Sequence, residues 1–180
     1  MKEYDETDHV GSARLKGIGI VRIVFGLLYA IDASFKWQPD FINKFSDYLT
    51  GALDGQSPPV QAWLGFWINI VKVNPQIFGH VTAIIETIVA LALMFGVFSN
   101  LADLGGALFS VVIWSTAEGF GGPYVAGSAD VGTAIVYVFV FVMLFLSRSG
   151  MHFGFDRKLT PLLGRWGVLA SGPLPKTNRS

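Results

Sequence analysis

The chain has 180 residues, of which 52% are hydrophobic and only 14% are charged, a charged share well below that of soluble domains. Its 13 basic and 13 acidic residues cancel, which argues against a nucleic-acid partner, and the absence of cysteine excludes disulfides, iron–sulfur clusters, thiolate zinc and covalent c-type haem. The mean hydropathy of +0.50 indicates one membrane domain with room for about four spans of ~20 residues.

The first apolar run, residues 17–36, follows a polar amino-terminal tail (residues 1–16) and predicts a retained span, because no small-residue cleavage site ends it. Arg22 lies inside the run, where an arginine costs at least ~2.5 kcal/mol unless it is paired or hydrated. At helical spacing it shares a small and polar face with Gly19, Gly26, Tyr29, Ala33 and Lys36. The opposite face is apolar: Ile20, Val24, Leu27, Leu28 and Ile31. We expect the polar face to point into a helix bundle.

Two amphipathic segments follow, at residues 40–53 and 60–73, separated by a Gly- and Pro-containing break. Both are too short and too polar to span a membrane. Three tryptophans accompany them, and this residue is enriched at the headgroup level: Trp37, Trp63 and Trp67. We predict interfacial helices that cover the mouth of the bundle, with ordinary interfacial packing as the alternative.

Asn74 followed by Pro75 predicts a helix start, and the second span should run from there to about residue 98. Glu86 falls on its small-residue face, which consists of Gly79, Thr82, Ala83 and Ala90. His80 points elsewhere, near the mouth of the helix.

A turn at Ser99-Asn100 predicts a third span at residues 101–117, and a fourth follows at 130–147. Each again carries a polar stripe, formed by Asp103, Gly106, Ala107, Ser110, Trp114 and Ala117 in the third and by Asp130, Thr133, Ala134, Tyr137 and Phe141 in the fourth. The sequence therefore predicts an all-α membrane protein: a four-transmembrane-helix bundle with amphipathic interfacial helices between spans 1 and 2.

Lysine and arginine outside the spans number 3 before the first span, 2 in the long first loop, none in the short loops and 6 from Arg148 onward. The positive-inside rule then predicts a multi-pass protein of the cell (plasma) membrane with both termini cytoplasmic. Residues 149–180 form the basic cytoplasmic tail, whose aromatic residues could rest on the membrane surface.

The charged residues and the glycine-rich loop between residues 114 and 130 predict a ligand pocket. Proton chemistry is assigned to Glu86, Glu118 and Asp130. The predicted binding residues are Arg22, Tyr29, Lys36, His80, Trp114 and Tyr124. Arg22 should pair internally with Glu86 or Asp103. The alternative is a structural ion-pair core. No metal or bis-histidine haem site is expected, because only one of three histidines lies in an apolar run.

The stretches RIVFGLLYAIDASFKW, HVTAIIETIVALALMFG and WSTAEGFGGPYVAGSADVGTAIVY together resemble the DoxX/DoxD family of four-span membrane proteins. That family includes the small membrane subunit of thiosulfate:quinone oxidoreductases. The resemblance implies oxidation of thiosulfate to tetrathionate at the outer face, with electrons passed to a quinone that is not covalently bound. It also implies a second, DoxA-like subunit or a larger respiratory complex as partner.

Three functions from different classes remain open on the sequence. The first is a quinone-linked oxidoreductase subunit in which a carboxylate delivers protons. The second is a non-catalytic anchor or assembly subunit of a respiratory complex. The third is a small-anion or proton conduit. The lack of an inverted repeat in the sequence argues against this third function. Membrane lipids are expected partners, and the small-residue stripes would permit a homo-oligomer.

Overall fold

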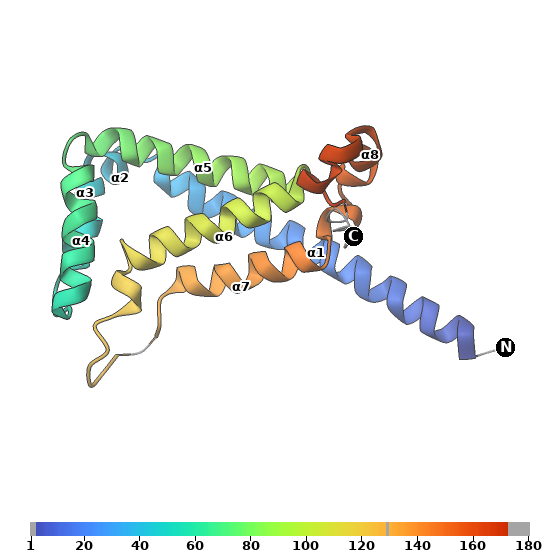
Figure 1. Cartoon of the computed structure of the whole chain (residues 1–180), viewed down its shortest axis with the longest axis horizontal. Coiled ribbons are helices and arrows are strands. Elements are labelled where there is room, and N and C mark those ends of the chain that lie inside the picture. Colours follow the sequence, from blue (N-terminus) through green and yellow to red (C-terminus); the bar gives the residue numbers. More distant parts are fainter. Residues whose placement is uncertain (1–2, 129, 173–180) are drawn as a thin grey trace, which may run out of the picture. The chain divides into compact units, whose positions relative to one another are not determined.

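The computed structural model describes residues 3–128 and 130–172, with side chains from residue 13 onward. Every regular element among these residues is helical, which confirms the predicted all-α class. In chain order the elements are α1 (Glu3–Lys36), α2 (Pro39–Asn43), α3 (Phe45–Gly51), α4 (Pro58–Val71), α5 (Pro75–Phe95), α6 (Ser99–Ser115), η1 (Gly119–Gly121), α7 (Thr133–Leu146), η2 (Ser149–Met151), α8 (Asp156–Leu162) and η3 (Gly164–Leu169) (Figure 1).

Two helical segments are long and apolar enough to cross a membrane: Ala13–Lys36, within α1, and Pro75–Phe95, which is α5. In each apolar window only 33% of the residues are buried, whereas the core helix of a soluble protein would be mostly covered. α6 has 17 residues and α7 has 14, fewer than the ~20 that usually span the hydrocarbon layer. The described residues therefore contain two candidate spans by length and composition.

Burial confirms the predicted helix faces of α1, α5 and α6, whereas two of the predicted inward residues of the fourth span, Asp130 and Thr133, are exposed. On α1 the predicted inward residues are buried or half-buried, and the five predicted outward residues are all exposed. On α5, Glu86 and its small neighbours are likewise covered, and on α6 the buried stripe includes Asp103 and Ser110. The 3.6-residue period of the sequence was sufficient to assign these faces.

Several predicted boundaries differ from the structure. α1 begins at Glu3 instead of residue 17, so its helical backbone extends into the polar amino-terminal segment. The turn expected at Ser99-Asn100 lies at residues 96–98, because Gly96 takes a left-handed φ of 61° after α5 and α6 already begins at Ser99. Pro75 does begin α5, and the Asn74 side chain accepts the Ile77 N–H at 3.2 Å, as the capping pattern predicts.

The predicted amphipathic helix at residues 40–53 is two short helices, α2 and α3. The break is at Lys44, whose φ of −105° and ψ of 19° leave the helical region. It separates a part that packs on α5, through Ile42 against Gly79, from a part that packs on α4 through Leu49. The second amphipathic segment is one helix, α4, close to the predicted bounds.

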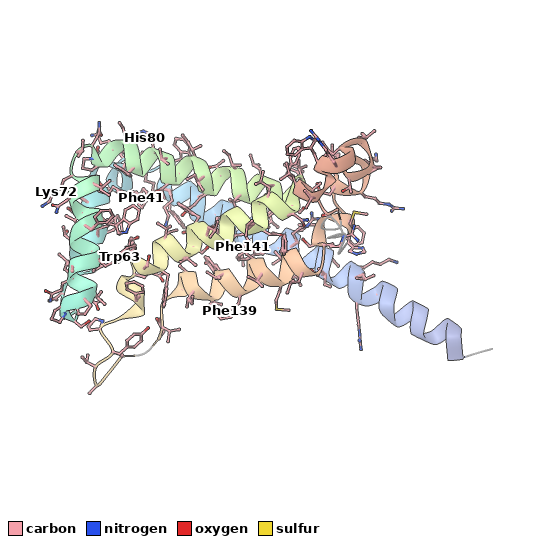
Figure 2. The ribbon with its side chains drawn as sticks, viewed as in Figure 1. Phe41, Trp63, Lys72, His80, Phe139 and Phe141 are labelled. Atoms are coloured by element: carbon pink, nitrogen blue, oxygen red, sulfur yellow. The ribbon has the colours of Figure 1, made fainter. Side chains whose placement is uncertain are left out.

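The chain forms two compact units, and the first consists of residues Met1–Ala30, Ile88–Gly105 and Phe141–Ser180. Within it, Gly26 lets α1 approach α5 closely, since a Cβ there would lie 2.8 Å from the Met94 backbone nitrogen. Phe25, Tyr29 and Phe141 form an aromatic cluster with ring centroids 5.1 to 5.7 Å apart; Phe141 is labelled in Figure 2.

The second unit consists of residues Ile31–Thr87 and Gly106–Val140. α3 and α4 pack together around a buried apolar core of Leu49, Leu64, Ile68 and Val71. The Trp63 indole N–H donates to the Ser115 carbonyl at 2.9 Å, and the buried Gln56 amide donates to the Gly119 carbonyl at 3.1 Å. These two bonds tie the α3–α4 pair to the end of α6 and to η1.

Candidate functional site

A cavity of about 570 Å³ lies in the second unit, lined by the end of α1, by α2 and α3, and by parts of α5 and α6. Its ionisable lining residues are Asp32, Lys36, Asp40 and Glu86. Its aromatic lining residues are Phe35, Phe41, Phe45, Tyr48 and Phe109. A few polar groups in a largely apolar wall, at this volume, are typical of a small-molecule site.

Glu86 is the most deeply buried charged residue of this cavity, with only 1% of its surface exposed. Its Oε2 atom has no hydrogen-bond partner among the described residues. The charges that act on it most strongly are those of Lys36 and Asp32. A buried carboxyl with a free oxygen at a cavity wall can hold a proton or exchange it with a ligand, because no protein group fixes its protonation state through that oxygen.

Lys36 contributes the cavity's positive charge. Its Nζ lies 3.4 Å from Oδ1 of Asp32, one helical turn earlier, and 5.2 Å from the centre of the Phe41 ring. A partly exposed pair of this kind adds little stability. The ammonium group has three donors and Asp32 takes one of them, so Lys36 can still donate to a ligand oxygen.

The aromatic wall on α2 and α3 is a contiguous set of rings. Phe41 contacts Phe45 and Tyr48 with ring centroids 5.5 and 5.3 Å away. α2 is held directly on α5, because a Cβ at Gly79 would lie only 3.1 Å from the Ile42 Cα. The short helices thus form one side of the cavity.

Arg22 lies in the first unit and is fully buried. Its Nη2 donates to the backbone carbonyls of His152 at 3.2 Å and Phe153 at 3.1 Å. Of its two predicted partners, Asp103 belongs to the same unit and acts on it electrostatically, whereas Glu86 belongs to the other unit. Arg22 therefore anchors the chain segment that follows α7, a contact that the sequence did not predict.

Glu118 and Trp114 hold the start of α7. Both carboxylate oxygens of Glu118 accept the Ala134 N–H, at 3.2 and 3.1 Å, which places a negative charge at the helix N-terminus. The Trp114 indole N–H donates to the Val131 carbonyl at 2.8 Å. Both residues were predicted to bind or act on a ligand, and both bond to backbone groups at or just before the start of α7.

Tyr124 and Asp130 are also bonded within this loop. The Tyr124 hydroxyl donates to the Phe120 carbonyl at 2.6 Å, and Oδ1 of Asp130 accepts the Gly132 N–H at 2.6 Å. Both side chains are exposed. The cavity lining contains neither them nor Glu118 and Trp114, although Thr116 and Ala117, at the start of the same segment, do line it.

The other two predicted binding residues lie outside the cavity as well. Tyr29 is buried in the aromatic cluster of the first unit, where it packs against Phe25. His80 is exposed near the start of α5, its Nδ1 lies 2.7 Å from the Gln76 carbonyl, and its ring lies 6.4 Å from that of Trp37 (Figure 2). Of the predicted site residues, only Lys36 and Glu86 come together in the cavity.

A comparison with protein-family models matches residues 17–119 to the DoxX family, which is more than half of the chain. The chain belongs to the DoxX family. It is accordingly a membrane protein, in agreement with its apolar, largely exposed helices. Searches of curated proteins and of solved structures found no match.

The DoxX match contains every residue that lines the cavity, from Asp32 to Ala117, and it also contains Arg22. Tyr124, Asp130 and the segment after α7 lie beyond it. The cavity is therefore built entirely from the part of the chain that is characteristic of the family.

Sequence reasoning missed several residues of the DoxX cavity. Asp32 was not among the predicted site residues, although its position one turn before Lys36 indicates an ion pair. Thr82 lies one turn before Glu86 on the same face and was assigned only to packing. Phe41 and Tyr48 have no pattern that distinguishes them from other aromatic residues of an interfacial helix.

The contacts of Glu118 lead to a first prediction. Replacing Glu118 with Ala should lower the free energy of unfolding by about 1 kcal/mol, because the first turn of α7 loses its capping carboxylate. Glu118→Gln, which keeps one acceptor oxygen, should lose less. Denaturation in detergent by circular dichroism measures both, and amide exchange at Ala134 localises the effect. An unchanged exchange rate at Ala134 would contradict the capping role.

Proposed function

We propose that this chain is a membrane subunit of a quinone-linked oxidoreductase that oxidises thiosulfate to tetrathionate. The observation that supports it best is the buried Glu86 carboxyl, with its unpartnered oxygen, in an aromatic cavity that also holds Lys36. A quinone headgroup is flat, apolar on its faces and polar at two carbonyl oxygens, and this lining fits those properties.

When bound, quinone supplies the electron acceptor: two thiosulfate ions form a new sulfur–sulfur bond and give up two electrons, and quinone takes these up with two protons. The chain has no cysteine and so no thiol redox centre of its own. Lys36 would donate a hydrogen bond to a carbonyl oxygen of the ligand. Glu86 would deliver one proton, be reprotonated through the cavity opening and then deliver the second. The rings of Phe41 and Tyr48 would cover the headgroup and limit access of water.

Thiosulfate itself is assigned to a partner subunit. The cavity carries three carboxylates, Asp32, Asp40 and Glu86, against the single ammonium of Lys36. This balance disfavours a dianion. The proposal therefore requires a second subunit, DoxA-like or part of a larger respiratory complex, that binds thiosulfate at the outer face. Homo-oligomers are compatible with the small-residue helix faces.

The proposed topology has four spans, formed by α1, α5, α6 and α7, in the cell membrane with both termini cytoplasmic. The charge distribution supports it, with basic residues concentrated at both ends of the chain. The shorter α6 and α7 would span with the help of flanking residues or local thinning of the bilayer.

The deciding experiment is thiosulfate-dependent reduction of decylubiquinone by the purified chain, alone and with its co-purifying partners. Turnover with partners, together with binding of decylubiquinone to the chain alone, supports the proposal. If no combination shows turnover and the chain binds no decylubiquinone, the proposal is rejected.

A second function, a non-catalytic anchor or assembly subunit, is favoured by a different observation. Arg22 and Glu118, two of the predicted site charges, are bonded to backbone groups and so serve the fold. An anchor or assembly subunit would co-purify with a larger oxidase. The assembly of that oxidase would depend on this chain, and its chemical step would not.

A further inference from the structure

The segment after α7, residues 148–172, is named here the C-terminal cap. Its basic residues are Arg148, Arg157, Lys158 and Arg165, and all four are exposed. The segment contains one acidic residue, Asp156, which is fully buried. The charge that the C-terminal cap presents to its surroundings is therefore of one sign.

Asp156 faces inward because its carboxylate is committed to the fold. Oδ1 accepts the Phe98 N–H at 2.8 Å, and Oδ2 accepts the Ser99 N–H at 2.9 Å and the Ser171 hydroxyl at 2.8 Å. With these bonds the carboxylate caps the start of α6. It is consequently not placed to neutralise the exposed Arg157 and Lys158 that follow it.

These two basic residues border a groove. A hollow of about 330 Å³ is lined by Phe153, Gly154, Phe155, Arg157 and Lys158. Phe153 and Phe155 are 61% and 55% exposed, so both rings are accessible to an apolar medium or partner. The groove thus offers two cations beside two exposed aromatic rings.

The groove lies at the end of a candidate span. The Phe155 N–H donates to the Phe95 carbonyl at 3.0 Å, and the Asp156 N–H donates to the Gly96 carbonyl at 2.8 Å. Phe95 is the last residue of α5, so α8 and the residues before it are held where that apolar helix ends (Figure 1). Lipid phosphates lie at this level of a bilayer, just outside the hydrocarbon layer.

We propose that the groove binds the phosphate of an anionic phospholipid through Arg157 and Lys158, with Phe153 and Phe155 resting against the lipid's glycerol and upper acyl region. The same end of the unit has a positive field. Burial, followed by the charges of Arg22, Arg148 and Arg157, lowers the pKa of His152 below its usual value. The site lies outside the DoxX match and does not depend on the proposed function.

The test measures lipid binding to the purified full chain by native mass spectrometry, with dioleoyl phosphatidylglycerol and dioleoyl phosphatidylcholine. The double variant Arg157→Gln/Lys158→Gln should bind phosphatidylglycerol about 30-fold more weakly, from ~1 kcal/mol per basic residue at a membrane surface. The matched control, Lys44→Gln/Lys72→Gln, removes the same charge from exposed positions in the other unit and should change binding less than about 3-fold.

Inorganic phosphate and glycerol phosphate, added in excess, separate a lipid site from a site for a free anion. Failure of both to displace phosphatidylglycerol supports the proposal, and displacement by either overturns it. Equal affinity for the two lipids, or an equal loss in the control variant, also overturns it. Should the double variant misfold, the wild-type protein decides, because its affinity for phosphatidylglycerol must fall as the NaCl concentration rises.

Discussion

Replacing Gly96 with Ala should lower the free energy of unfolding by at least about 3 kcal/mol. Gly96 has a φ of 61°, where a Cβ costs energy, and its Cβ would overlap Nη1 of Arg22. The fully buried guanidinium would then have to move away from the two carbonyls that it bonds, those of His152 and Phe153. Unfolding of the purified protein in mixed micelles, followed by circular dichroism, measures the loss.

Gly105→Ala is the matched control, because a Cβ at that position of α6 meets nothing within 4 Å. It should be neutral or slightly stabilising, as expected for Ala in place of Gly inside a helix. A double-mutant cycle of Gly96→Ala with Arg22→Met tests the cause, since removing the guanidinium should relieve part of the loss. Fully additive losses would show that contact with Arg22 is not responsible.

The helix faces could be predicted from the sequence, and the partners of the buried charges could not. Periodicity places Arg22 and Glu86 on covered faces because it depends only on residues of the same helix. The carbonyls that bind Arg22 lie about 130 residues further along the chain, in a segment predicted to be a basic tail. Backbone carbonyls leave no trace in the residue types, so no sequence pattern could have indicated them.

The glycine-rich loop shows the same limitation in another form. Glu118 and Asp130 are carboxylates in a loop between apolar runs, a pattern equally typical of catalysis and of helix capping. The structure distinguishes the two, because the oxygens of Glu118 face the Ala134 N–H and Asp130 bonds the Gly132 N–H. The cavity, by contrast, depends on how α2 and α3 pack on α5, and amphipathicity alone does not specify that packing.

Arg22 and Glu86 are both buried charges, yet their surroundings assign them different work. The Arg22 guanidinium donates to two backbone carbonyls, so its removal should lower the stability of the fold. Glu86 borders a cavity and one of its oxygens has no hydrogen-bond partner among the described residues. Its removal should therefore reduce the reaction rate with a bound ligand more than it reduces stability. The contrast makes Glu86 the most informative position for the proposed function.

Replacing Glu86 with Gln should lower the rate of thiosulfate-dependent quinone reduction by about 100-fold or more, the usual effect of removing a general acid. Gln has nearly the same shape and remains able to hydrogen-bond, so the cavity and the affinity for quinone should change little. The expected pattern is therefore a large fall in kcat with KM for quinone nearly unchanged. Steady-state assays with decylubiquinone, on protein shown by gel filtration to be folded, measure both constants.

Two further carboxylate variants test whether the fall in kcat is specific to Glu86. Asp47→Asn removes an exposed carboxylate of α3 that does not line the cavity, and its kcat should stay within about 3-fold of wild type. Glu118→Gln should likewise retain turnover, because that residue caps α7. Should Glu118→Gln lose as much kcat as Glu86→Gln, the proton chemistry would belong to the glycine-rich loop and the cavity would lose its proposed role.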